Sequence, residues 1–253
     1  MRRLLAAVAA SIGYFTTVPI PIDGTRAPSA DAVGALPLVG AFVGAASGGL
    51  AYGAERLAPS FGPATAYAAL ALLTGAIHVD GFLDTCDAAF ASVAPERRRA
   101  ILDDPRHGTY AVAGMSVLVA AWRGALGACP PRRRPAALTF ACATARLAAV
   151  WARVAASPAA SVTPSEALRV RPPLAWLVAQ TCALAAMAAA IDLRLMLAVP
   201  AACGASLALG AWLRARFGGV LSGDAYGFTI AALEPLLVAA VALVRTGPVD
   251  GGW

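Results

Sequence analysis

The chain of 253 residues contains no lysine and no asparagine, and charged residues make up only 13% of it. Soluble domains carry roughly 25% charged residues, so this scarcity argues against a soluble protein. Hydrophobic residues account for 59% of the chain, which favours an all-α polytopic integral membrane protein. The net charge of +6 comes from arginine alone. The chain has no basic patch interleaved with aromatic residues. We therefore expect the positive charge to face anionic lipid head groups or an anionic substrate, and we expect no nucleic-acid partner.

Other features are missing as well. The five cysteines form no CxxC pair and are odd in number, so we interpret them as small buried hydrophobic residues rather than metal ligands or disulfides. The chain has no P-loop and no serine–histidine–carboxylate pattern. Because repeats, low-complexity tracts and linkers are also absent, we expect residues 1–253 to form a single integral-membrane domain.

Seven apolar runs are candidates for membrane-spanning helices, which need about 18 or more such residues. They cover 34–54, 61–77, 109–129, 135–155, 173–191, 193–212 and 228–244. The N-terminal segment resembles a signal peptide, but the chain after it returns repeatedly to the membrane. We therefore predict about seven spans preceded by a membrane-associated helix that ends at Pro19 and Pro21.

Tracing the chain through these spans puts the loops at 79–108, 156–172 and 213–227 on one side of the membrane. That side carries nine arginines and the other side six. Cytoplasmic loops are enriched in arginine, so we expect a bacterial inner-membrane protein with these loops in the cytoplasm. The PPRRRP turn at 130–135 opposes this bias.

The stretch HVDGFLDTCDA places a histidine and three aspartates directly after an apolar run. On a helix, Asp80, Asp84 and Asp87 share one face because their spacing is four and three. Carboxylates on one face repel each other unless a cation lies on them, and hard oxygen ligands suit Mg²⁺ or Mn²⁺. The spacing predicts a magnesium site, with a solvated acidic face as the alternative. His78 is more often a hydrogen-bonded structural residue than a ligand.

Further polar residues lie close to the predicted spans. Asp104 and Arg106 belong to the loop DDPRHGTYA, and Asp224 lies in a glycine-rich turn before the last span, on the same side as the aspartates above. Arg146 and Glu234 are ionisable residues inside spans, which marks them as functional candidates. Aspartates that hold a metal near arginines favour phosphoryl transfer at the membrane surface.

Several motifs resemble one known family. The segment TGAIHVDGFLDTCDA at 74–88 resembles the T-G-x-x-H-x-D-G-x-x-D-T-x-D-[AG] signature of the cobalamin synthase family, adenosylcobinamide-GDP ribazoletransferase. Four further motifs match in order: YFTTVPIP at 14–21, ALPLVGAFVG at 35–44, PERRRAILDDPRHGTYAV at 95–112 and SGDAYGF at 222–228. The chain departs from the family pattern at Ile230, Ala231 and 157–165.

The resemblance implies that adenosylcobinamide-GDP reacts with α-ribazole, or its 5′-phosphate, to give adenosylcobalamin, or its 5′-phosphate, and GMP. It implies Mg²⁺ on Asp80, Asp84 and Asp87, with these three and Asp224 as catalytic residues. It also implies substrate contacts from His78, Asp104, Arg106, Arg146 and Glu234. The lipid bilayer is a further expected partner, and a homo-oligomer is left open.

Two other functions are compatible with an acidic site in a membrane protein. A phosphotransferase of the CDP-alcohol type also uses spaced aspartates and a metal. Its D-G-x-x-A-R pattern is not met here, because Phe82, Leu83 and Asp84 follow Asp80 and Gly81. A transporter would use the carboxylates as an ion path and would place them near the middle of the bilayer, whereas most acidic residues here cluster at one edge.

Overall fold

The structure is a computed structural model that describes residues 2–22, 28–58, 60–156, 171–219 and 221–244. Within these ranges every regular element is a helix, which confirms the all-α prediction. The elements are α1 Arg2–Phe15, α2 Ala30–Gly34, α3 Leu36–Leu57, α4 Phe61–Thr74, α5 Ile77–Phe90, α6 Pro95–Leu102, α7 Thr109–Ala128, η1 Pro131–Arg133, α8 Arg134–Ala155, α9 Leu174–Ile191, η4 Leu193–Leu197, α10 Ala198–Arg216 and α11 Gly223–Leu243. The predicted departure at 157–165 and most of the predicted loop 156–172 lie outside the described residues.

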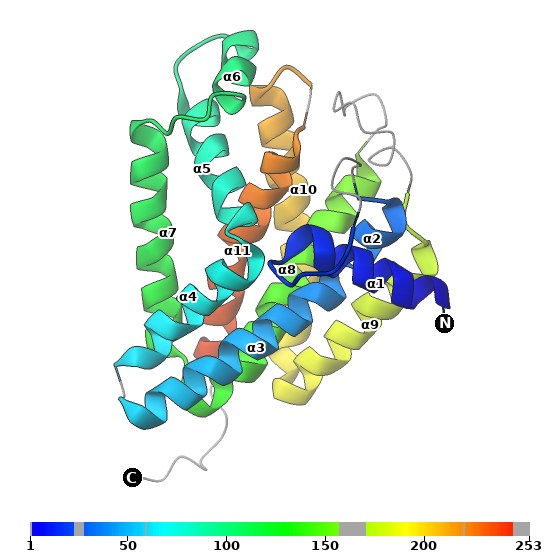
Figure 1. Ribbon diagram of the computed structural model, residues 1–253, viewed down its shortest axis with the longest axis vertical. Helices are drawn as coiled ribbons and strands as arrows, with labels where there is room; N and C mark the ends of the chain where they lie inside the picture. The colour runs from blue at the N-terminus through cyan, green and yellow to red at the C-terminus, as the bar shows by residue number, and fades with distance from the viewer. Residues whose placement is uncertain (1, 23–27, 59, 157–170, 220, 245–253) are drawn as a thin grey trace.

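Six of the seven predicted spans are confirmed as helices long and apolar enough to cross a membrane. They are α3, α7, α8 with η1, α9, α10 with η4, and α11. Figure 1 shows that α5 and α10 run toward the end of the molecule that carries α6 and that α7 and α11 run away from it, while the α3–α4 and α7–α8 connections lie at the opposite end.

The seventh predicted span, at 61–77, is not one straight helix. The chain bends by 91° between α4 and α5, because Gly75 and Ala76 both have positive φ angles, 59° and 57°. Each helix has 14 residues and is therefore about 21 Å long, too short for a hydrocarbon core of about 30 Å. The pair is a broken span or a re-entrant loop, and α5 is the helix expected for Asp80, Asp84 and Asp87 in the predicted connection 79–108.

The break is held by the segment that follows α1. The backbone N–H of Thr17 donates to the carbonyl of Leu73 at 2.8 Å, and the Thr17 hydroxyl donates to the carbonyl of Leu72 at 3.0 Å. These carbonyls belong to the last turn of α4, where helix carbonyls need partners from outside the helix, and that of Leu72 also accepts from the N–H of the capping residue Gly75 at 3.3 Å. The N-terminal helix therefore exists as predicted, but it ends at Phe15, and the residues after it cap α4.

Helices α3 and α8 pack against each other through glycines on one face of α3. A Cβ atom added at Gly40 would lie 2.5 Å from the carbonyl oxygen of Cys142, and one at Gly48 would lie 2.5 Å from the Cα of Pro135. Small residues let membrane helices approach this closely. The glycine-rich run of the first span is therefore a packing surface, and α8 is the most buried of the long helices.

The PPRRRP turn has a structural role at the end opposite α6. Arg134 donates from Nε to the carbonyls of Leu126 and Cys129, each at 3.1 Å, and pairs with Glu55 of α3. Arg133 donates to the carbonyl of Val244 at 3.1 Å. Cations are favourable at helix carboxyl ends. Two of the three arginines therefore bind the carboxyl ends of α7 and α11.

Candidate active site

Helices α5 and α11 meet at a glycine contact that sets the position of the acidic residues. A Cβ atom added at Gly81 would lie 2.8 Å from the Cα and 3.0 Å from the carbonyl oxygen of Asp224. Next to this contact, the ring of Phe82, which follows Gly81, stacks on that of Phe228, one turn beyond Asp224, with centroids 5.0 Å apart and planes within 8°. Because only glycine fits at position 81, the first turn of α11 lies directly on the helix that carries Asp80 and Asp84.

Three side chains converge at this contact. Ligand atoms of Asp80, Asp84 and His107 all lie within 4.8 Å of one another, and Nδ1 of His107 is 3.5 Å from Oδ1 of Asp84. Asp80 and His107 are exposed and Asp84 is partly buried. Sequence reasoning did not select His107, although it belongs to the loop in which Asp104 and Arg106 were selected.

Asp87 has different surroundings from the other two aspartates of α5. Its buried carboxylate accepts hydrogen bonds from the backbone N–H groups of Gly108 and of Ala111, the latter at 2.9 Å. These amides form the first turn of α7, where a negative charge is favourable. Asp87 therefore joins α5 to α7, and through Gly108 it positions the adjacent His107 beside Asp84.

Asp104 and Arg106 form a two-pronged ion pair on the surface. Nε and Nη2 of Arg106 donate to the two carboxylate oxygens of Asp104, each at 2.9 Å. These bonds lower the pKa of Asp104 to about 2. Because a lowered pKa keeps a carboxylate ionised at every pH above it, the pair persists from mildly acidic to alkaline pH. Arg106 remains 87% exposed and can meet a phosphate from solution.

His78, Arg146 and Glu234 form a buried network between α5, α8 and α11. Nη1 of Arg146 lies 2.6 Å from Oε1 of Glu234 and 2.9 Å from the carbonyl of Cys142, and Nη2 lies 3.3 Å from Nδ1 of His78. The side chain of Arg146 is 1% exposed. The structure thus brings these three predicted substrate contacts together, but as partners of one another.

The acidic group concentrates negative charge. The carboxylate of Asp84 interacts electrostatically with those of Asp80, Asp224 and Asp87. The two carboxylates offer the oxygen ligands that suit Mg²⁺ or Mn²⁺, whereas the imidazole is a ligand more typical of Zn²⁺ or Fe²⁺. The donor set of Asp80, Asp84 and His107 therefore fits a divalent cation, with Asp224 close by.

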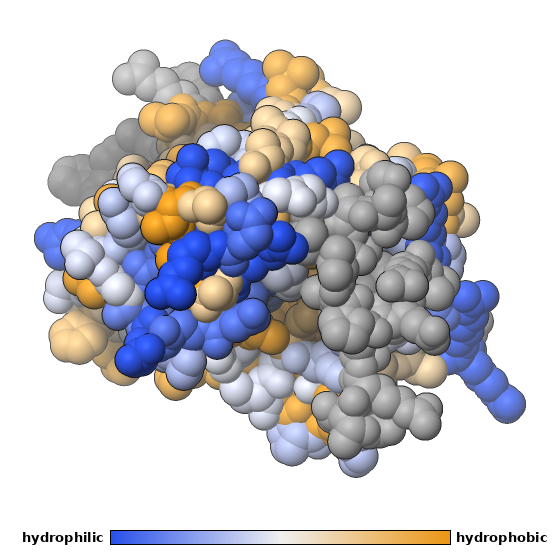
Figure 2. All heavy atoms as spheres, turned by 90° about the horizontal axis from the view of Figure 1, so that it is seen from above, coloured by the Kyte–Doolittle hydropathy of each residue, from blue (hydrophilic) through white to orange (hydrophobic). Residues whose placement is uncertain are grey.

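This site faces the end of the molecule that carries α6. Figure 2 looks onto that end and shows hydrophilic side chains gathered left of its centre, with hydrophobic ones among and beside them. The side chains of Asp80 and His107 are exposed.

A cavity of about 260 Å³ adjoins the site on the side of α8 and the N-terminal segment. Polar residues in its wall include His78, Arg153 and Asp224. The remaining wall is mostly apolar and comes from α1, α2, α3, α5, α8 and α11: Phe15, Pro28, Val33, Leu36, Ile77, Ala149, Val150, Gly223, Tyr226, Gly227 and Ile230. Asp224 therefore belongs both to the acidic group and to the cavity.

Comparison with known proteins gives a consistent result. The family model described as cobalamin-5-phosphate synthase matches residues 7–243. An adenosylcobinamide-GDP ribazoletransferase of Deinococcus radiodurans is 34% identical over 90% of this chain and 82% of its own length. One of Pseudomonas paraeruginosa is 30% identical over 96% of this chain and 100% of its own length. No solved structure matches the chain significantly.

Proposed function

Because the chain belongs to the cobalamin-5-phosphate synthase family, we propose that it acts as an adenosylcobinamide-GDP ribazoletransferase at the site around Asp80 and Asp84. The 3′-hydroxyl of α-ribazole, or of its 5′-phosphate, attacks the phosphorus atom that carries cobinamide. A new P–O bond forms, the bond between this phosphorus atom and the bridging oxygen of the diphosphate breaks, and GMP leaves with that oxygen. The products are adenosylcobalamin, or its 5′-phosphate, and GMP.

The observation that carries this proposal is the convergence of Asp80, Asp84 and His107 beside Asp224. A Mg²⁺ ion held by the carboxylates of Asp80 and Asp84 would neutralise charge on the diphosphate. Protein side chains carry out the other two tasks, which are proton acceptance and phosphate binding. Asp224 accepts the proton of the attacking hydroxyl, and the exposed guanidinium of Arg106 contacts a phosphate at the entrance.

Asp87 has a positioning role in this scheme, since the backbone of the first turn of α7 occupies both of its oxygens. The buried network of His78, Arg146 and Glu234 fixes α5, α8 and α11 around the site. The location that fits best is the bacterial inner membrane with the α6 end in the cytoplasm, in keeping with the arginine bias of the loops.

The test is turnover by Asp84→Asn, which keeps the size of the side chain and removes its charge. Loss of one fixed charge that acts on the transition state costs about 10²- to 10³-fold in rate, and the dependence on Mg²⁺ should shift to higher concentration. The matched control is Glu96→Gln, an exposed carboxylate of α6 at the same end of the molecule, which should leave turnover unchanged. Full turnover by Asp84→Asn with unaltered Mg²⁺ dependence would refute the assignment.

A further inference from the structure

The cavity beside Asp224 has no role in the scheme so far, and its chemistry differs from that of the acidic group. Among the lining residues that the structure describes, only His78, Arg153, Asp224 and Tyr226 carry ionisable side chains. At about 260 Å³ it is close to the lower end of the range of roughly 300–1,000 Å³ that small-molecule pockets occupy. It can enclose one compact, mostly apolar molecule.

The two substrates place different demands on the protein. The corrin ring with its adenosyl group is several times larger than a nucleoside, so the cavity cannot enclose it. A guanine base presents several polar groups that need hydrogen-bond partners, and a diphosphate needs cations. A benzimidazole nucleoside is smaller, and its base is flat, uncharged and methylated, which suits an apolar wall.

The position of the cavity also distinguishes the two substrates. In phosphoryl transfer the attacking and leaving oxygens lie roughly in line on opposite sides of phosphorus. The side chains of Asp80 and His107 are exposed, so their side of the acidic group has room for the large charged substrate. Asp224 is shared with the cavity, whereas Asp80 and Asp84 do not line it. A hydroxyl held in the cavity therefore reaches the acidic group from its other side.

We propose that this cavity, between the N-terminal segment, α5, α8 and α11, binds the base of the accepting nucleoside, and that Ala149 limits the size of the base it takes. The inference rests on the proposed function, because the reaction supplies the identity of the nucleoside. The 3′-hydroxyl of the bound nucleoside points toward Asp224.

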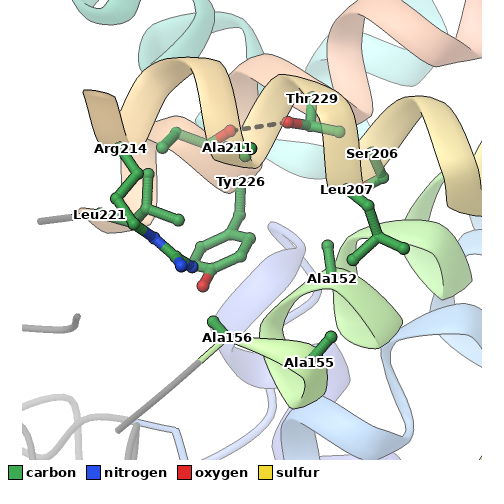
Figure 3. A pocket seen from close by; sticks show the side chains of 12 residues that line it. Ala152, Ala155, Ala156, Ser206, Leu207, Ala211, Arg214, Leu221, Tyr226 and Thr229 are labelled. Carbon is green, nitrogen blue, oxygen red and sulfur yellow. Dashed lines mark hydrogen bonds between the residues drawn. The ribbon is translucent and has the colours of Figure 1, made fainter. Parts of the chain in front are cut away.

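Two other cavities among the described residues fit less well. One of about 590 Å³ lies between α4 and α7 and reaches Gly127, 19 residues from Gly108 at the start of α7, or about 28 Å along the helix. Another of about 190 Å³ lies between α8, α10 and α11. Figure 3 shows that Tyr226 and Arg214 point into it, with Ala152, Ala155 and Ala156 on its α8 side. It is smaller and does not reach Asp224.

The cavity between α8, α10 and α11 supplies a matched control. Ala149 and Ala152 lie one turn apart on α8, and each lines one of the two cavities. Ala149→Leu and Ala152→Leu make the same chemical change in the same helix. Each adds three carbon atoms to the wall of a different cavity.

The experiment measures KM for α-ribazole and for adenosylcobinamide-GDP in both variants. One methylene group too many in an apolar pocket costs about 10- to 200-fold, so Ala149→Leu should raise KM for α-ribazole at least that much and leave the other KM unchanged. The riboside of unsubstituted benzimidazole, which lacks the two methyl groups of the base of α-ribazole, should show a smaller rise in KM in this variant. Ala152→Leu should leave both values unchanged. If Ala149→Leu does not fold, Ala149→Val provides the same test with two added carbons.

Equal KM values for α-ribazole in Ala149→Leu and wild type would overturn the inference and leave the function standing, as would a rise confined to Ala152→Leu. Equilibrium dialysis with radiolabelled α-ribazole alone separates the two claims. Wild-type protein that makes no cobalamin but binds α-ribazole, with binding lost in Ala149→Leu, would overturn the function and support the cavity assignment.

Discussion

The ion pair between Arg146 and Glu234 permits a sharp test of how the site is held together. Its atoms lie 2.6 Å apart, and the two side chains are 1% and 5% exposed. Glu234→Ala would leave the guanidinium with the carbonyl of Cys142 and the ring of His78 as its partners. A buried charge that loses its opposite charge in this way costs about 3–5 kcal/mol.

For a chain of this size, 1 kcal/mol corresponds to roughly 2–4 °C in Tm, so Glu234→Ala should lower Tm by about 6–20 °C. The double variant Arg146→Met with Glu234→Leu should lower it less, because neither charge is left alone. The assay is thermal unfolding of detergent-purified protein, followed by tryptophan fluorescence. If Glu234→Ala changes Tm by less than about 2 °C but raises KM for substrate, the pair is not structural and Arg146 binds substrate directly.

Further predictions concern the two contacts that position the aspartates. Gly81→Ala should reduce turnover by about 10²-fold, since a displacement of about 1 Å at a reacting group has that effect, and its new Cβ would meet the backbone of Asp224 at 2.8 Å. Gly124→Ala, in open space on α7, should retain full turnover, and equal rates in the two variants would contradict the packing argument. Asp87→Asn should destabilise the protein by about 1.5–3 kcal/mol, the contribution of hydrogen bonds to a charged group. An unchanged Tm together with altered Mg²⁺ dependence would instead make Asp87 a metal ligand.

Local patterns in the sequence were sufficient for much of the fold. The apolar runs predict six of the spans, and the spacing of Asp80 and Asp84 places both carboxylates on one face of a helix, as the structure shows. These signals work because hydrophobic burial and helical periodicity are properties of neighbouring residues. The bend after Thr74 has no such signal, because the apolar run continues through it and its capping residue, Thr17, lies 56 positions from Leu73.

The sequence predicts the site only in part, again because contacts between residues distant in the sequence leave no local pattern. Asp87 has the spacing of a third ligand, but the first turn of α7 packs on it, and spacing along one helix cannot reveal a neighbouring helix. His107 lies 23 positions beyond Asp84 and reaches it only because the loop folds back. Arg146 and Glu234 were each identified as ionisable residues in a span, but their pairing across 88 positions depends on the tertiary fold.

The most direct test of the central claim uses detergent-purified wild-type protein with adenosylcobinamide-GDP, α-ribazole and Mg²⁺. GMP release and cobalamin formation are followed in the same sample, with a parallel sample that contains EDTA. The structure and the family predict equal amounts of both products, and none when EDTA removes the metal. No product from folded protein, or GMP released without cobalamin, would contradict transfer to the nucleoside at this site.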